Sequence, residues 1–179
     1  MRKLTVFFLF AIMVCTLAMG CREKTASFDC LRIHIRANDN SQAGQAVKYA
    51  VKEKVADLLT PALASASTKR LAMETVESRL EAIKLLCEQA LLENGFDYGA
   101  SVSLKREHFP LRSYGEFMFE GGYYDALIIV LGEGRGDNWW CMVYPPLCFI
   151  GAEGEGDGKV VYRSKILEII ESFKQKYFK

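Results

Sequence analysis

The chain has 179 residues, which is enough for one domain with its own hydrophobic core and too few for two domains of ordinary size. Half of the residues are hydrophobic and a quarter are charged, a composition typical of globular proteins. The formal net charge is +1, and basic and acidic residues are interspersed along the chain. This pattern argues against nucleic-acid binding, which depends on a concentrated positive surface.

The N-terminal segment has the layout of an export signal. Arg2 and Lys3 precede an uninterrupted apolar run over residues 4–19. The run is shorter than the roughly 20 residues that a transmembrane helix needs. Residues 1–20 are therefore interpreted as a secretory signal peptide, with an uncleaved N-terminal membrane anchor as the alternative.

A third interpretation of this segment is lipoprotein processing. Gly20 and Cys21 follow the apolar run directly, so Cys21 is the candidate for lipidation. Residues 21–28 are mostly polar and are expected to form a linker, and residues 29–179 are expected to form a single globular domain. All three interpretations place this domain outside the cytoplasm.

The expected domain begins with a strand. Over residues 31–36, leucine and isoleucine alternate with Arg32, His34 and Arg36. Alternation with a period of two predicts a β-strand with one buried face and one polar face, and His34 is expected at the surface.

Two helices are expected next. Valine and leucine recur at helical spacing over residues 47–58, and Pro61 is expected to end this first helix. Apolar residues then step by three and four without a break over residues 73–90, which predicts one continuous helix. Asn94 and Gly95 are a typical stop for it.

The rest of the chain turns mainly to strands. Polar and apolar side chains alternate over residues 101–107, which indicates a strand, and Gly121 and Gly122 indicate a turn. Residues 126–131 are continuously apolar, as in a strand buried on both faces. An apolar stripe over residues 166–177 predicts a C-terminal helix. The order of elements predicts an α/β (α+β) sandwich, a single domain in which helices cover a mostly antiparallel sheet.

A glycine-rich segment, GEGRGD at residues 132–137, follows the buried strand. A phosphate-binding loop would need a helix directly after the glycines, so that its N–H groups point at the phosphate. The next residues are NWWCMVYPP, which indicate extended chain. The loop is therefore interpreted as a conformational device, and no nucleotide or other cofactor is expected.

The most informative segment is NWWCMVYPPLCF at residues 138–149. Neighbours on an extended chain point to opposite faces, so one of Trp139 and Trp140 can be core while the other is an exposed interaction anchor. The alternative is that both indoles are buried. Cys141 and Cys148 bracket two prolines that can fold the segment back, which favours a disulfide over free thiols.

The other cysteines and the histidines give weaker signals. Cys87 lies on an apolar helical stripe and is interpreted as a buried hydrophobe, although a Cys30–Cys87 disulfide is an alternative. No C-x-x-C pair occurs, and His34 is far from His108 in sequence, so no metal site is expected.

Catalytic motifs are also missing from the sequence. No G-x-S-x-G or H-E-x-x-H occurs, and no carboxylates have the spacing of an acid–base pair. An enzyme is therefore not expected. The alternative is an exported cell-envelope hydrolase that uses His34 with a neighbouring carboxylate.

Two blocks of the sequence resemble a known family. LRIHIRAND at residues 31–39, followed by Gln45, Lys48, Val51 and Lys52, and YYDALIIVLGEGRGDNWWCMVYPPLCF at residues 123–149 are similar to the stage II sporulation protein R family. The resemblance implies a signalling protein made in the forespore and exported into the space between the two membranes around it. Its implied partner is the membrane-embedded aspartic protease of the mother cell, which then processes the sigma-E precursor.

The chain departs from this family at residues 38–40, where Asn-Asp-Asn stands in place of the usual Asn-Ser-Asp. Lipidation at Cys21 would also tether a signal that otherwise need only be secreted. The residues expected to contact the partner are Trp139, Trp140, Tyr144, Pro145 and Pro146, followed by Arg32 and His34.

Overall fold

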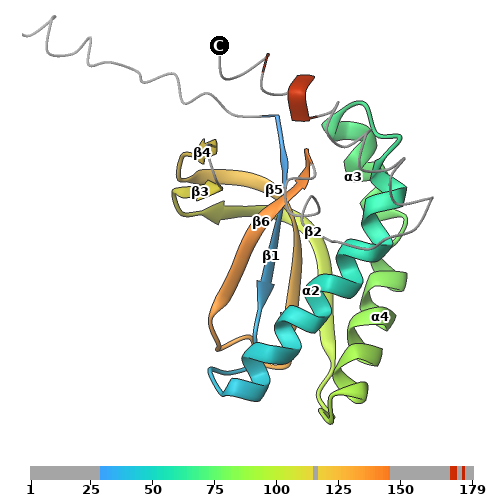
Figure 1. The fold of residues 1–179 in the computed structure, drawn as a ribbon, viewed down its shortest axis with the longest axis vertical. Helices are drawn as coiled ribbons and strands as arrows, with labels where there is room; N and C mark the ends of the chain where they lie inside the picture. Colours follow the sequence, from blue (N-terminus) through green and yellow to red (C-terminus); the bar gives the residue numbers. More distant parts are fainter. Residues whose placement is uncertain (1–28, 115–116, 146–169, 173–174, 176–179) are drawn as a thin grey trace, which may run out of the picture.

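A computed structural model describes residues 29–114, 117–145, 170–172 and 175. Its elements are β1 (Leu31–Arg36), α2 (Gln42–Leu63), α3 (Lys69–Glu77), α4 (Leu80–Glu93), β2 (Ala100–Phe109), β3 (Arg112–Tyr114), β4 (Phe117–Phe119), β5 (Gly122–Leu131) and β6 (Asn138–Tyr144). Four strands form one sheet in the order β2-β5-β1-β6, and β3 pairs with β4 in a second, small sheet (Figure 1).

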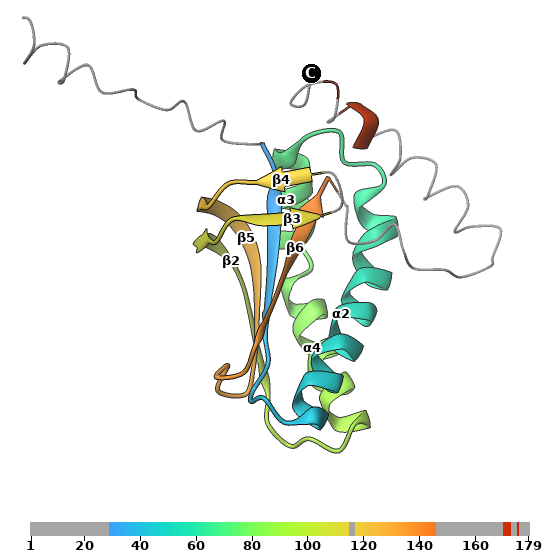
Figure 2. The same ribbon diagram turned by 60° about the vertical axis from the view of Figure 1, so that its left-hand side comes forward.

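The main sheet is mixed. β1 runs parallel to β5, whereas β1 and β6 are antiparallel, as are β2 and β5. Helices α2, α3 and α4 pack against one face of it, and Figure 2 shows the two layers side by side. The predicted α+β architecture, with helices on a mostly antiparallel sheet, is confirmed.

The core between sheet and helices follows from the alternation within β1. Leu31, Ile33 and Ile35 face the helices and are almost fully buried. The apolar stretch of β5 lies between β2 and β1, and its residues 126–129 are buried on both faces, as its sequence predicts.

Helix α2 begins and ends for identifiable reasons. The Ser41 side chain caps it by accepting a hydrogen bond from the Gly44 N–H at 3.0 Å. The prediction that Pro61 ends this helix is wrong, because the helix continues to Leu63. Pro61 lies in the last turn, where the missing N–H removes only one bond of the helical ladder.

The continuous helix expected over residues 73–90 is also wrong, because the chain breaks between α3 and α4 at Ser78 and Arg79. The Arg79 N–H bonds to the carbonyl of Val76, which tightens the last turn. The Ser78 hydroxyl and the Arg79 guanidinium both donate to the Thr75 carbonyl. These side chains satisfy a backbone oxygen at the helix end and so stabilise the break.

The second face of the sheet is not a solvent-exposed polar face, which corrects the expectation for β1. Arg32 is 0% exposed and His34 is 1% exposed. They lie in a second apolar cluster that includes Phe109 at the end of β2, Phe119 of β4 and Ile170. The alternation itself is confirmed, but its polar side is covered by chain that is distant in sequence.

Candidate functional site

On the second face of the sheet, His34 of β1 lies directly opposite Trp140 of β6. Their rings stack with centroids 3.5 Å apart and an interplanar angle of 17°. Cross-strand neighbours share a face, so this stacking is a direct result of the register. The imidazole is thus covered by the indole on one side.

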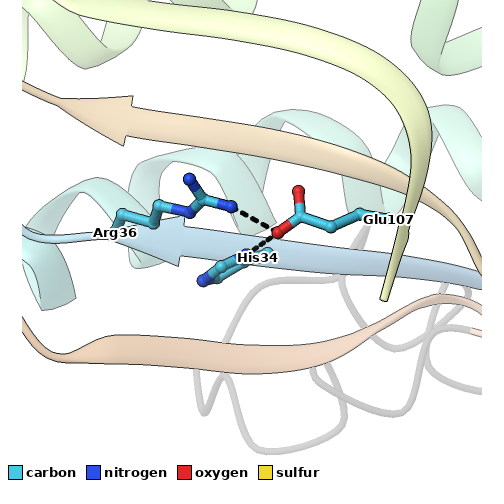
Figure 3. A network of polar contacts seen from close by, with 3 residues as sticks. All are labelled: His34, Arg36 and Glu107. Carbon is cyan, nitrogen blue, oxygen red and sulfur yellow. Dashed lines mark hydrogen bonds and ion pairs between the residues drawn. The ribbon is translucent and has the colours of Figure 1, made fainter. Parts of the chain in front are cut away.

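A carboxylate completes the surroundings of His34. Glu107, from β2, accepts a hydrogen bond from His34 Nδ1 at 2.9 Å, and Arg36 donates to the same Glu107 oxygen (Figure 3). The bond from Nδ1 to an ionised carboxylate implies the Nδ1–H tautomer of the neutral ring. His34, Arg36 and Glu107 therefore form one polar network inside a mostly apolar cluster.

The pKa values in this network follow from burial and hydrogen bonding. Burial lowers the pKa of His34, and the nearby Asn138 and Glu107 side chains only partly oppose this effect. Burial disfavours ionisation of Glu107, but the hydrogen bonds from Arg36 and His34 outweigh it and lower its pKa. At neutral pH the network holds a neutral imidazole, a carboxylate and a guanidinium.

Arg32 is the second buried polar residue of this face. Its guanidinium carbon lies 4.5 Å from the centroid of Phe109, 5.0 Å from that of Tyr124 and 5.5 Å from that of Phe119. Its Nε donates to the Cys141 carbonyl on β6 at 3.2 Å. Cation–π contacts are strongest when both groups are shielded from water, as they are here. Arg32 therefore joins β1 to β6 and to the aromatic side chains above it.

Phe109 shows how β2 reaches this cluster. Its ring centroid is 4.7 Å from that of Trp140, although β2 and β6 are the two outer strands of the four-stranded sheet. Three strand spacings in a flat sheet would separate them by about 14 Å. The C-terminal half of β2 must therefore curve across the second face. Figure 3 shows this curvature, with Glu107 carried over β1.

Glu107 and Phe109 were not predicted as site residues. They stand at alternate positions of β2, so the sequence does indicate that they share a face. The direction in which the strand curves has no comparable local signal.

Trp139 lies on the opposite face from Trp140, as the alternation predicts. It is partly buried against the helix-side core, and the Lys52 ammonium lies 6.0 Å from its ring centroid. Trp140 is also only partly buried. The two indoles therefore flank strand β6, and neither one is fully buried or fully exposed.

The backbone N–H groups of the glycine loop before β6 are all used in hydrogen bonds within the protein. Each N–H group of residues 132–137 donates a hydrogen bond, either to a backbone carbonyl or to the side chain of Asn38 or Asn40. None of these six donors points outward to a phosphate. A Cβ added at Gly136 would lie 2.5 Å from the carbonyl carbon of Asp39, so the close approach of the two loops requires glycine there.

Two of the remaining predicted site residues are less accessible than expected. Tyr144 and Pro145 are buried. Pro146, Cys148 and Cys21 lie outside the described residues, so the Cys141–Cys148 disulfide and the lipidation of Cys21 stay predictions.

Cys30 and Cys87 are both free, which excludes the disulfide considered between them. Burial raises the pKa of each thiol to about 12. Cys87 is thus the buried hydrophobe that its helical stripe predicts.

Other kinds of site have little support in the part of the chain that the structure describes. It holds no group of three or more histidine, cysteine or carboxylate side chains arranged for a metal ion. None of its helices is both long and apolar enough to cross a bilayer. A cleft of about 580 Å³ lies where α3 meets the starts of β1 and β5, lined by Asp29, Thr68, Lys69, Arg70, Met73, Glu74, Glu77 and Asp125, and does not include His34.

The lowered pKa of His34 predicts a pH-dependent stability. Below about pH 6.5, where an unfolded histidine takes up a proton, the folded state resists protonation, so the free energy of unfolding should fall as the pH falls. The loss should approach, at most, about 1.4 kcal/mol per pH unit. The lowered pKa of Glu107 acts in the same direction, but only below its ordinary value of 4.5.

Urea unfolding between about pH 7.5 and pH 5, followed by tryptophan fluorescence, measures this dependence. His34→Gln keeps a side chain that can donate to Glu107 but does not titrate. It should flatten the profile, and an equally steep loss in this variant would show that another group is responsible.

Comparison with known proteins agrees with these features of the chain. Residues 27–154 match the family described as Stage II sporulation protein R (spore_II_R). The Stage II sporulation protein R of Bacillus subtilis (strain 168) is 32% identical over 120 residues, covering 67% of this chain and 54% of that protein. The chain thus spans about half the length of that relative. No solved structure matches the chain. The matched residues include strands β1 to β6 and helices α2 to α4 of the described part of the chain, so the chain belongs to the stage II sporulation protein R family.

Proposed function

We propose that this protein is an exported sporulation signal that activates the membrane-embedded aspartic protease of the mother cell. The protease would then process the sigma-E precursor, and the protein would act in the space between the forespore and mother-cell membranes. The observation that carries the proposal is family membership over residues 27–154. The export-like segment at residues 1–20 and the absence of catalytic motifs from the sequence support it.

Activation requires a difference in binding between two states of the protease. The protein must bind the active conformation more tightly than the inactive one, because equal affinity for both would shift nothing. The signal therefore needs a surface of defined shape, and no chemistry of its own. A rigid segment held by buried contacts suits this role.

We place the contact on the segment around Trp139 and Trp140, whose indoles are partly exposed on either side of β6. Tryptophan is strongly enriched among residues that dominate binding energy. Tyr144 and Pro145, which are buried, would support this segment, and Pro146, which follows in the sequence, lies outside the described residues.

Arg32 and His34 were expected to touch the partner, and their burial argues against direct contact in this conformation. We assign them a supporting role behind β6, Arg32 through the Cys141 carbonyl and His34 through Trp140.

The test is reconstitution of the protease and its precursor in vesicles, with the purified protein added from the extracytoplasmic side. Precursor cleavage should rise with added protein and saturate. Trp139→Ala should raise the concentration that gives half-maximal cleavage by about 30-fold, the equivalent of a 2 kcal/mol binding anchor. Tyr123→Ala is the matched control, because this tyrosine is 66% exposed and lies on β5, outside the proposed segment.

Two outcomes would count against the proposal. Cleavage that does not respond to the wild-type protein would remove the proposed activity. If the Tyr123 and Trp139 variants are both folded and shift the half-maximal concentration equally, the proposed contact face is wrong.

A specific observation also bears on the hydrolase alternative. The neighbouring carboxylate that it requires is present, since Glu107 bonds to His34 Nδ1 at 2.9 Å. However, the imidazole is 1% exposed and is covered by Trp140 and Phe109, so a substrate would have no direct access to it. In the reconstituted assay, His34→Gln that still activates the protease would argue for signalling without catalysis.

A further inference from the structure

Lys48 is a lysine in an unusual environment. It lies on α2, is 2% exposed, and forms no ion pair within the described part of the chain. Its ammonium donates to Gln45 Oε1 at 2.6 Å and to the Asp137 carbonyl at 3.0 Å. Burial lowers the pKa of Lys48, and the charge of Asp137 partly opposes this. A buried cation with only neutral acceptors in contact is costly for stability, so a purely structural role would be better served by an apolar side chain.

The contacts of Lys48 converge on Asp137, the residue just before β6. The Asp137 N–H donates to Asn40 Oδ1 at 2.6 Å, while its carbonyl accepts from Lys48. Gln45 in turn donates from Nε2 to the Asp39 carbonyl at 2.9 Å. Asp137 is therefore held on both sides, by the loop after β1 and by the first turns of α2.

One residue, Asn138, separates Asp137 from the tryptophan pair. Trp139 faces α2, where Lys52, one turn after Lys48, lies over its ring. Trp140 faces the other way and stacks on His34. Because side chains alternate along a strand, any shift or rotation of the backbone at Asp137 would move both indoles together.

We propose that Lys48 is the positioning residue that sets how Trp139 and Trp140 are presented to the partner. This inference rests on the proposed function, since it assigns a role within that contact face. Lys48 acts through the Asp137 backbone and does not itself meet the partner. The buried ammonium anchors the start of β6 to α2 at one defined point, which a flexible apolar side chain cannot do.

Lys48→Met is the direct test, because methionine has a similar length and no donor. The chain has only two tryptophans, both at this site, so quenching of their fluorescence by acrylamide reports on the segment itself. We expect the variant to remain folded, with tryptophan quenching raised about twofold. In the reconstituted assay the half-maximal concentration should rise about tenfold with the maximal cleavage rate unchanged.

Two further variants sharpen the result. Lys54→Met removes another lysine of α2, one that pairs with Glu93 at the surface, and should match the wild type in both measurements. Gln45→Leu leaves Lys48 in place but removes one acceptor of its ammonium and the link to Asp39, so it should give a smaller shift in the same direction. If Lys48→Met does not fold, Gln45→Leu still tests whether Lys48 positions the two tryptophans.

The outcomes separate this inference from the proposed function. Unchanged tryptophan quenching in folded Lys48→Met, or in Gln45→Leu if Lys48→Met does not fold, would overturn the positioning role, whatever the protease does. If the wild-type protein fails to activate the protease, the proposed function fails, while the quenching experiment still decides whether Lys48 places the tryptophans. A loss of maximal rate without a change in half-maximal concentration would also contradict positioning.

Discussion

Arg32→Ala should lower the free energy of unfolding by about 4 kcal/mol, the range seen when a large buried side chain is truncated or a buried charge network is broken. The guanidinium is 0% exposed and lies against three aromatic rings. Its removal would leave a cavity between β1 and the rings, and the Cys141 carbonyl would lose the hydrogen bond from Nε. Urea unfolding at neutral pH measures the change.

Two other substitutions test the cause. Arg32→Leu refills most of the space with apolar atoms and should lose only about half as much, because the cavity is then small. Arg70→Ala removes an arginine that is largely exposed in its pair with Glu74, and should change stability by less than about 0.5 kcal/mol. A loss of similar size in the Arg32 and Arg70 alanine variants would contradict the buried role of Arg32.

Gly136→Ala should destabilise the protein by about 3 kcal/mol, the upper end of the cost of forcing atoms into a packed site. The new Cβ would lie 2.5 Å from the Asp39 carbonyl carbon and 2.9 Å from Ala37 Cβ. The Asp39 carbonyl is backbone and is held by Gln45, so the clash cannot be relieved by rotating a side chain. The loop between β5 and β6 would have to move instead, and the tryptophan pair with it.

Gly99→Ala is the matched control for this prediction. Its added Cβ would meet only Glu88 Oε1, at 3.5 Å, which is an ordinary contact. Its stability should stay within about 0.5 kcal/mol of the wild type. If both glycine variants lose stability equally, the close approach of the two loops is not the reason.

Much of the fold could be predicted because its signals are local. The apolar stretch of β5 and the stop at Gly95, whose φ is 82°, depend on neighbours in sequence. The break between α3 and α4 could not be predicted, because Ser78 and Arg79 are neither glycine nor proline. The break is stabilised by hydrogen bonds from these two side chains to the Thr75 carbonyl, which the sequence pattern does not indicate.

The candidate site divides in the same way. The opposite orientation of Trp139 and Trp140 follows from strand alternation and could be predicted. The environment of His34 could not, because Glu107 lies 73 residues away and reaches it only through the curvature of β2. Polar residues at alternate positions of a strand normally indicate a solvent-exposed face. Here that face of β1 is covered by a strand that is distant in sequence.

The position of β1 has a consequence for the order in which the protein can form. β1 is the first strand of the described chain, yet it lies between β5 and β6, and Arg32 pairs with Ala126 and Met142. Its partners are thus synthesised roughly a hundred residues later, and pairings so distant in sequence form slowly. A chain that emerges N-terminus first, from a ribosome or through a membrane, would therefore carry β1 without a partner until β5 appears. If the chain is exported N-terminus first as we propose, the main sheet cannot assemble on the far side of the membrane until β5 and β6 have crossed it.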